Sequence, residues 1–147
     1  MLAGILVCVL VLAAASAFGL SRRRRDGKLT EPGPAQLTAG QLGQPLGARA
    51  TLLQFSSEFC APCRATRQVL GDVAGLVDGV AYVEIDAESR LDLVRRLNVL
   101  STPTVLVLGP DGTITRQATG LPRKPDVIAA LGTVIPGSAD LTYKEGR

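Results

Sequence analysis

Apolar and polar residues follow two different patterns along this chain, and the pattern changes near residue 50. Before it, nineteen uncharged residues, Leu2 to Leu20, precede four arginines and a stretch rich in Pro and Gly without apolar periodicity. After it, short apolar runs alternate with segments whose apolar residues recur every three or four positions. The later part therefore predicts strands alternating with helices. The Pro/Gly-rich stretch predicts an irregular linker, with part of 35–46 as a candidate for packing on the domain.

Four strands and three helices are expected after residue 50. The strands are expected at 51–56, 80–86, 104–108 and 113–118, and the helices at 61–77, 89–97 and 125–134. The run at 104–108 is continuously apolar, which is typical of a strand covered on both faces. Gly109-Pro110-Asp111-Gly112 is a turn signal between the last two strands. This order predicts an α/β fold, a mixed β-sheet with helices on both faces.

The first apolar run is long enough to cross a bilayer. Nineteen helical residues span about 28 Å, against roughly 30 Å of bilayer hydrocarbon. Ala15-Ser16-Ala17 looks like a signal-peptide cleavage site, but a signal peptide carries its positive charge before the apolar run. Here the arginines follow the run, and positively charged flanks stay in the cytoplasm. We expect one uncleaved transmembrane helix with the domain on the cytoplasmic side of the cell membrane; an extracytoplasmic domain and a cleaved signal are the alternatives.

The expected domain organisation has four parts. These are a transmembrane anchor at 1–21, with residues 2–20 in the membrane, a basic and then Pro/Gly-rich linker at 22–47, an α/β domain at 48–136, and a polar tail at 137–147.

The positive charge of the chain is concentrated in one place. The formal net charge is +3, yet without Arg22 to Arg25 there are 12 basic against 13 acidic residues. The basic balance therefore gives no argument for nucleic-acid binding, and we expect no nucleic-acid partner. The four arginines are interpreted as a stop to translocation that also attracts anionic lipid headgroups. The absence of His excludes His-based acid–base catalysis and His metal sites.

The candidate chemistry lies in Cys60 and Cys63, where the first predicted strand leads into the first predicted helix after residue 50. Backbone N–H groups and the helix dipole stabilise a thiolate at a helix start. Pro62 fits the first turn, where its missing N–H does no harm. Half of a zinc site is the alternative, but a second cysteine pair and His are both missing, so we expect no metal. Cys8 is interpreted as an apolar filler of the membrane helix.

Three motifs together resemble the thioredoxin superfamily over about residues 48–135. They are Phe59-Cys60-Ala61-Pro62-Cys63, Thr102-Pro103-Thr104 and Gly120. The resemblance implies a thioredoxin-like mixed sheet, with Pro103 as the cis-proline of a loop opposite the cysteines. It also implies a surface that supports the site and binds a disulfide-containing protein substrate, formed by Phe59, Ala61, Pro62, Thr102 and Pro103.

Thiol–disulfide exchange follows from the positions of the two cysteines. Cys60, nearer the helix start, is expected to attack a partner disulfide, and Cys63, one turn further on, to resolve the mixed disulfide. We expect no cofactor, because the sequence contains no nucleotide or flavin motif. Electrons would come from another protein or a small thiol. The function indicated is a membrane-tethered thiol–disulfide oxidoreductase that reduces protein disulfides. A non-catalytic binding module that holds a membrane or envelope partner is the alternative.

Five positions depart from the family pattern. Phe59 stands for a tryptophan and Ala61 for a glycine, which are mild changes. Gln54 stands where the family has a buried aspartate, Tyr82 where it has a lysine, and Ser56 where it has a tryptophan. Gln cannot accept a proton from Cys63, so we expect slower general disulfide reduction than a true thioredoxin provides, and a narrower range of partners. Glu58 is interpreted as a solvated charge.

Overall fold

The computed structural model describes residues 1–33 and 35–135. In chain order, the elements are α1 (Leu2–Arg25), α2 (Ala39–Leu42), β1 (Ala50–Ser56), α3 (Ala61–Leu76), β2 (Val80–Asp86), α4 (Leu91–Arg96), β3 (Thr104–Leu108), β4 (Ile114–Thr119) and α5 (Lys124–Val134). Every expected strand and helix after residue 50 is present. The tail predicted at 137–147 lies outside the described residues.

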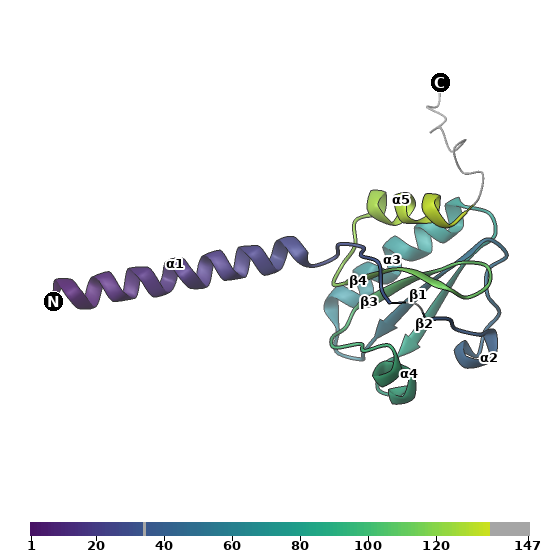
Figure 1. The fold of residues 1–147 in the computed structure, drawn as a ribbon, viewed down its shortest axis with the longest axis horizontal. Helices are drawn as coiled ribbons and strands as arrows, with labels where there is room; N and C mark the ends of the chain where they lie inside the picture. Colours follow the sequence, from purple (N-terminus) through teal and green to yellow (C-terminus); the bar gives the residue numbers. More distant parts are fainter. Residues whose placement is uncertain (34, 136–147) are drawn as a thin grey trace, which may run out of the picture.

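The four strands form one mixed sheet in the order β2-β1-β3-β4. β1 pairs parallel to β2 and antiparallel to β3, and β3 pairs antiparallel to β4. Helices α3 and α5 cover one face of the sheet, and α2 and α4 lie on the other (Figure 1). The predicted mixed sheet with helices on both faces is therefore confirmed.

The core has two layers, one on each face of the sheet. On the first face, Leu52 and Val107 of the sheet pack with Leu70 of α3 and Leu131 of α5. On the second face, side chains of β1 and β3 pack with α4 and with the segment before β1; they include Leu53, Phe55, Leu106, Leu93 and Leu37. All seven residues of β1 are buried, because both faces of this central strand are covered. The strand that leads to the cysteines is thus rigidly held.

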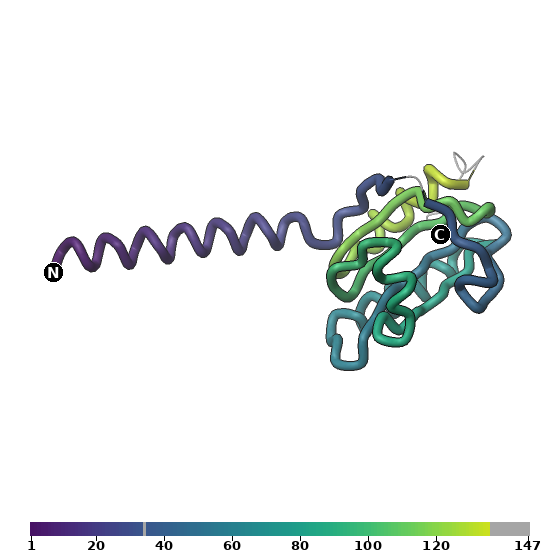
Figure 2. Tube along the Cα trace, turned by 60° about the horizontal axis from the view of Figure 1, so that its bottom comes forward, coloured from purple at the N-terminus to yellow at the C-terminus, as the bar shows by residue number. Residues whose placement is uncertain are grey.

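Helix α1 projects from the domain as a separate rod in both views (Figures 1 and 2). None of its residues is buried, and its mean hydropathy reaches 2.5. By length and composition it is able to cross a membrane, although a signal sequence would meet the same criteria. The helix continues through Arg25, four residues beyond the predicted anchor. Basic residues are favourable in a last helical turn because they offset the negative end of the helix dipole.

The segment between α1 and β1 lies on the domain over much of its length. Thr30 pairs with Gln117, and Gln36 with Thr113, as isolated antiparallel bridges along β4. Leu37 is fully buried, and α2 follows with a capping box at its start. The irregular segment expected at 35–46 thus packs on the sheet, and contact with the domain begins as early as Gly27. The domain boundaries themselves stay a prediction.

Two elements, α4 and β4, differ most from their predicted bounds, while β1, α3 and α5 each differ by one residue at one end. Helix α4 is shorter than 89–97, because the Ser89 hydroxyl donates to the Asp86 carbonyl in a turn that precedes the helix. Strand β4 starts and ends one residue later than predicted, and its pairing with β3 is shifted between Val107 and Leu108. Neither difference moves the cysteine pair.

Candidate active site

Cys60 and Cys63 form a disulfide at the point where the chain leaves β1 and enters α3. Cys60 is the N-cap residue of α3, and its Sγ accepts the backbone N–H of Cys63 at 3.2 Å. Cys60 is partly exposed, whereas Cys63 is only 2% exposed. In the reduced protein, the same N–H and the helix dipole would favour a thiolate on Cys60. The geometry therefore suits Cys60 as the attacking sulfur and Cys63 as the resolving one.

A second loop is bound to the cysteine loop from the side of β3. The Thr102–Pro103 peptide bond is cis, as the resemblance implied. The hydroxyl oxygens of Ser57 and Thr102 lie 2.9 Å apart, which joins the two loops. Gly120, at φ +88°, donates its N–H to the Pro103 carbonyl at 2.8 Å. Sequence reasoning missed Ser57, because its partner lies 45 positions away and no local pattern points to it.

The residues predicted to form the binding surface differ in how accessible they are. Phe59 is 95% exposed, and Ala61 and Pro62 are also exposed. Thr102 is half-buried, and the Pro103 side chain is buried. The first three are thus free to touch a partner, while Pro103 supports the loop from within.

Gln54 joins the cysteine helix to β2 beneath the disulfide. Its side chain is fully buried, its Nε2 donates to the Cys63 carbonyl at 2.9 Å, and its Oε1 accepts the Tyr82 hydroxyl at 2.9 Å. Burial, together with the nearby Glu84 carboxylate, raises the pKa of Tyr82 to about 12, so the phenol stays neutral and donates at ordinary pH. Gln54 and Tyr82, two of the departures from the family pattern, thus form one uncharged, hydrogen-bonded pair.

An ion pair lies beside this neutral pair, nearer the surface. The Arg67 guanidinium donates to both carboxylate oxygens of Glu84, at 2.6 and 2.8 Å. This bidentate contact lowers the pKa of Glu84, and it is the largest cause of the shift. Sequence reasoning missed both residues, because they come from different elements and meet only when α3 packs on β2. Within 1–33 and 35–135, there is no group of three or more His, Cys, Asp or Glu side chains placed to hold a metal ion.

Comparison with known proteins agrees with this geometry. The thioredoxin family model matches residues 39–132, well over half of the chain. The chain belongs to the thioredoxin family. A thioredoxin of Chlamydia trachomatis is 31% identical over 77 residues, which cover 52% of this chain and 74% of that protein. A thioredoxin of Mycoplasma pneumoniae is 26% identical over 89 residues, covering 60% of this chain and 86% of the relative.

Other relatives match over shorter stretches or in fold alone. A putative thioredoxin of Arabidopsis thaliana is 32% identical over 57 residues, which are 39% of this chain and only 37% of that protein. The structure of a Nicotiana alata thioredoxin has a TM-score of 0.53 at 20% identity, covering 60% of this chain and 75% of that one. The structure of chloroplastic thioredoxin z has a TM-score of 0.53 at 22% identity, covering 59% of this chain and 79% of that one.

A thioredoxin fold that carries a Cys60–Cys63 disulfide at the start of α3 supports thiol–disulfide oxidoreductase activity. Such an enzyme implies a disulfide-containing protein as substrate and a reductant that restores the thiols. The apolar helix α1 adds a weaker indication that the enzyme is associated with a membrane.

Proposed function

We propose that this chain is a membrane-tethered oxidoreductase that reduces protein disulfides through Cys60 and Cys63. The observation that carries the proposal is the position of Cys60, which caps α3, is partly exposed, and accepts an N–H from its partner cysteine. A nucleophilic sulfur needs both access and a stabilised thiolate. Cys60 is accessible and lies at a helix start, where a thiolate is stabilised once the disulfide is reduced, and Cys63, to which it is bonded, is shielded from solvent.

The reaction starts from the reduced protein. The Cys60 thiolate attacks one sulfur of the substrate disulfide, forms a mixed disulfide, and releases the other substrate sulfur as a thiolate that takes a proton from water. Cys63 then loses its proton, attacks Cys60 Sγ, and releases the second substrate thiol. Two electrons pass from the cysteine pair to the substrate. A thiol donor, either another protein or a small thiol, returns them by the reverse exchange.

The surroundings of the cysteines supply binding rather than acid–base chemistry. We infer that Phe59, Ala61 and Pro62 touch the substrate, and that Thr102 and Pro103 support the surface on the other side. Gln54 holds the Cys63 carbonyl but has no group that accepts a proton. The resolving step therefore relies on water to deprotonate Cys63, and general disulfide reduction is slow compared with that of a thioredoxin.

The anchor and its topology are part of the same proposal. We infer that α1 remains in the cell membrane as a single span, with the predicted anchor at 1–21 and the domain at 48–136. The four arginines that follow the apolar run favour a cytoplasmic domain. The alternative, an extracytoplasmic domain, would bring the cysteine pair into contact with envelope proteins.

The Cys63→Ser variant tests the reaction, because it blocks the resolving step. We expect it to accumulate stable mixed disulfides between Cys60 and its partners. A reductant should cleave these mixed disulfides. The Cys60→Ser variant is the matched control and should accumulate few. If neither variant forms such adducts, the chain is a binding module that keeps the fold without the chemistry.

A labelling experiment tests the topology. In a Cys8→Ser variant, only Cys60 and Cys63 remain to react with a membrane-impermeant maleimide after gentle reduction. Labelling only after cell lysis would support a cytoplasmic reductase. Labelling of intact cells would assign the domain to the outer side of the membrane, and a mature protein starting near residue 18 would contradict the anchor.

A further inference from the structure

The end of α1 and the cysteine loop lie at the same edge of the sheet. Two residues after α1 ends at Arg25, Gly27 donates its N–H to the carbonyl of Thr119, the last residue of β4. Across the sheet, Thr119 pairs with Thr104 of β3, and Thr104 pairs with Phe55 of β1. This line of residues, from Gly27 to Phe55, crosses the ends of the strands and does not run along an outer strand. We call it the redox edge, because the cysteine loop follows directly from it.

The redox edge is short. Neighbouring strands lie about 4.8 Å apart, so three spacings put the chain that leaves the anchor roughly 14 Å from the strand that carries the cysteines. A second connection between the end of α1 and the cysteine loop passes through fewer hydrogen bonds. Gly120, which lies against Gly27, donates to the carbonyl of Pro103 in the loop that is joined to the cysteine loop. In Figure 1, the arrowheads of β1 and β2 point to the side of the domain from which α1 projects.

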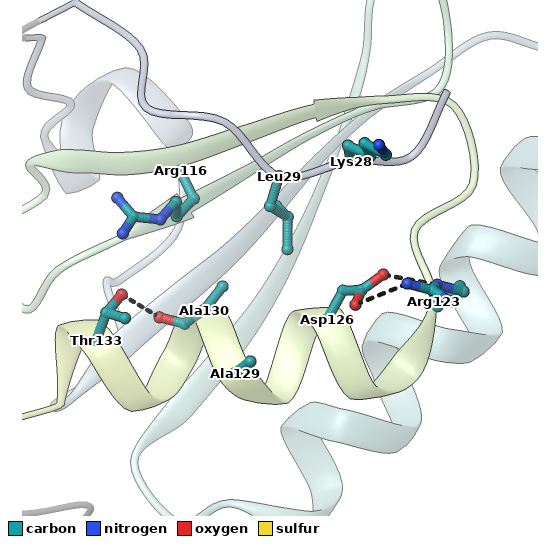
Figure 3. Close-up of a pocket in the computed structure, with 8 residues that line it drawn as sticks. All are labelled: Lys28, Leu29, Arg116, Arg123, Asp126, Ala129, Ala130 and Thr133. Carbon is teal, nitrogen blue, oxygen red and sulfur yellow. Dashed lines mark hydrogen bonds and ion pairs between the residues drawn. The ribbon is translucent and has the colours of Figure 1, made fainter. Parts of the chain in front are cut away.

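The chain after α1 is held in place rather than free to swing. Thr30 exchanges backbone hydrogen bonds with Gln117 in both directions, each 2.7 Å long. Leu29 packs against the core beneath β4, and Figure 3 shows its side chain pointing from this segment toward α5. Glu31 pairs with Arg116 of β4 at 2.9 Å. With only Asp26 between α1 and Gly27, the redox edge stays close to the end of α1.

The chemistry of the surface at this end of the domain suits a partner near lipid. Phe59 and Leu100 are 95% and 85% exposed, and they flank the cysteine and Pro103 loops in the sequence. Leu121, directly after Gly120, is 44% exposed and lines a pocket of about 310 Å³ together with Arg23, Arg24 and other residues of the anchor's end and α5. The same pocket is also lined by Asp26 and by Asp126, which pairs with Arg123. Exposed apolar side chains next to Arg23 and Arg24 match the boundary between acyl chains and anionic headgroups.

We propose that the redox edge faces the bilayer, and that the substrates are disulfides of integral membrane proteins, in segments that lie at the lipid surface. This rests on the proposed function, because it names the substrate class of the same cysteine pair. The physical reason is the short connection, which keeps the redox edge near the end of α1. A cysteine pair held against the membrane meets disulfides in the same membrane at high effective concentration, whereas large soluble proteins have to enter the gap beneath the domain.

The orientation is tested with a tryptophan reporter, since the chain has no Trp of its own. In the full chain in liposomes, we compare Phe59→Trp with Leu76→Trp, which lies at the opposite end of α3 and is also exposed. Sixteen helical residues separate the two ends by about 24 Å. We expect lipids brominated near the headgroup to quench Phe59→Trp several-fold more than Leu76→Trp. Equal quenching of the two variants would overturn the orientation.

The substrate class is tested by kinetics in the same liposomes. The substrates are one disulfide peptide attached to lipid through a short or a long spacer, and a small soluble aromatic disulfide. We expect the wild type to reduce the short-spacer peptide several-fold faster than the long-spacer peptide. The comparison variant carries a flexible insert of about twelve residues between Arg25 and Asp26, which adds roughly 20 Å of reach. It should lose this preference while reducing the soluble disulfide at the wild-type rate.

The outcomes separate this inference from the proposed function. If the wild type fails to reduce even the soluble disulfide, the proposed oxidoreductase is wrong, and the inference falls with it. If it reduces the soluble disulfide but shows no preference between spacers, only the inference is wrong. A preference that persists unchanged in the insertion variant also refutes it, because the short connection through Asp26 would then have no role.

Discussion

Replacing Gln54 by Glu changes one buried group and almost nothing in its shape. Gln54 bridges the Cys63 carbonyl and the Tyr82 hydroxyl, each at 2.9 Å. A protonated Glu reproduces both contacts, because its O–H donates to Cys63 and its carbonyl oxygen accepts from Tyr82. An ionised Glu has no donor, and it places a carboxylate oxygen against the carbonyl oxygen of Cys63. The site therefore favours the neutral form of the new side chain.

The magnitude follows from the burial of position 54, which is fully removed from solvent. Full burial raises the pKa of a carboxyl by up to about 3–5 units, and the Tyr82 hydroxyl offsets part of this. A net rise of about 3 units moves the pKa from about 4.3 to about 7, and at 1.36 kcal/mol per unit this amounts to roughly 4 kcal/mol. Because the folded-state pKa is raised, this stability is present below about pH 4 and is lost as the pH rises through about 7.

The assay is urea unfolding of the oxidised full chain in detergent, repeated across the pH range from acid to mildly basic. Oxidation keeps the thiols of Cys60 and Cys63 from titrating, and the wild type is the matched control because Gln does not ionise. We expect Gln54→Glu to lie within about 1 kcal/mol of the wild type near pH 4.5 and to fall roughly 4 kcal/mol below it near pH 8. If the free energies of unfolding of the two proteins change with pH in parallel, the conclusion that position 54 favours a neutral side chain is refuted.

Four further predictions follow from the same contacts. Insulin reduction should be slower than with a thioredoxin, because Gln54 cannot take the proton of Cys63; an equal rate would contradict this. Tyr82→Phe should lower the free energy of unfolding by about 1–3 kcal/mol in urea by leaving Gln54 Oε1 unpaired, and by much less in a Gln54→Leu background. Ser57→Ala and Thr102→Val should each cost about 0.5–1.5 kcal/mol, and the double variant no more than the larger single loss; additive losses would mean that the hydroxyls do not interact. Because the folded-state pKa of Tyr82 is raised to about 12, wild-type stability should fall as the pH rises from about 10 to 12, and Tyr82→Phe should lack this fall.

The order of the elements and the identity of the cysteine pair could be read from the sequence. Strand β3 is a continuous apolar run, and β1 leads directly into a cysteine that caps a helix. Both patterns are local: burial on two faces requires unbroken apolar residues, and a helix start offers free N–H groups to a sulfur. The motif around Pro103 identified the second loop of the site through its resemblance to the thioredoxin superfamily, because contiguous residues alone do not place that loop beside the cysteines.

The tertiary structure alone decided which distant residues meet. Gln54 and Tyr82 are 28 positions apart, and Ser57 and Thr102 are 45 apart. Their contacts depend on strand register and loop packing, which no local pattern specifies. The course of the chain before β1 is a further example. Its composition predicted a linker, but the edge of β4 offers unpaired backbone groups. Pairing with that edge brings the end of α1 to the end of the sheet from which the cysteine loop leaves.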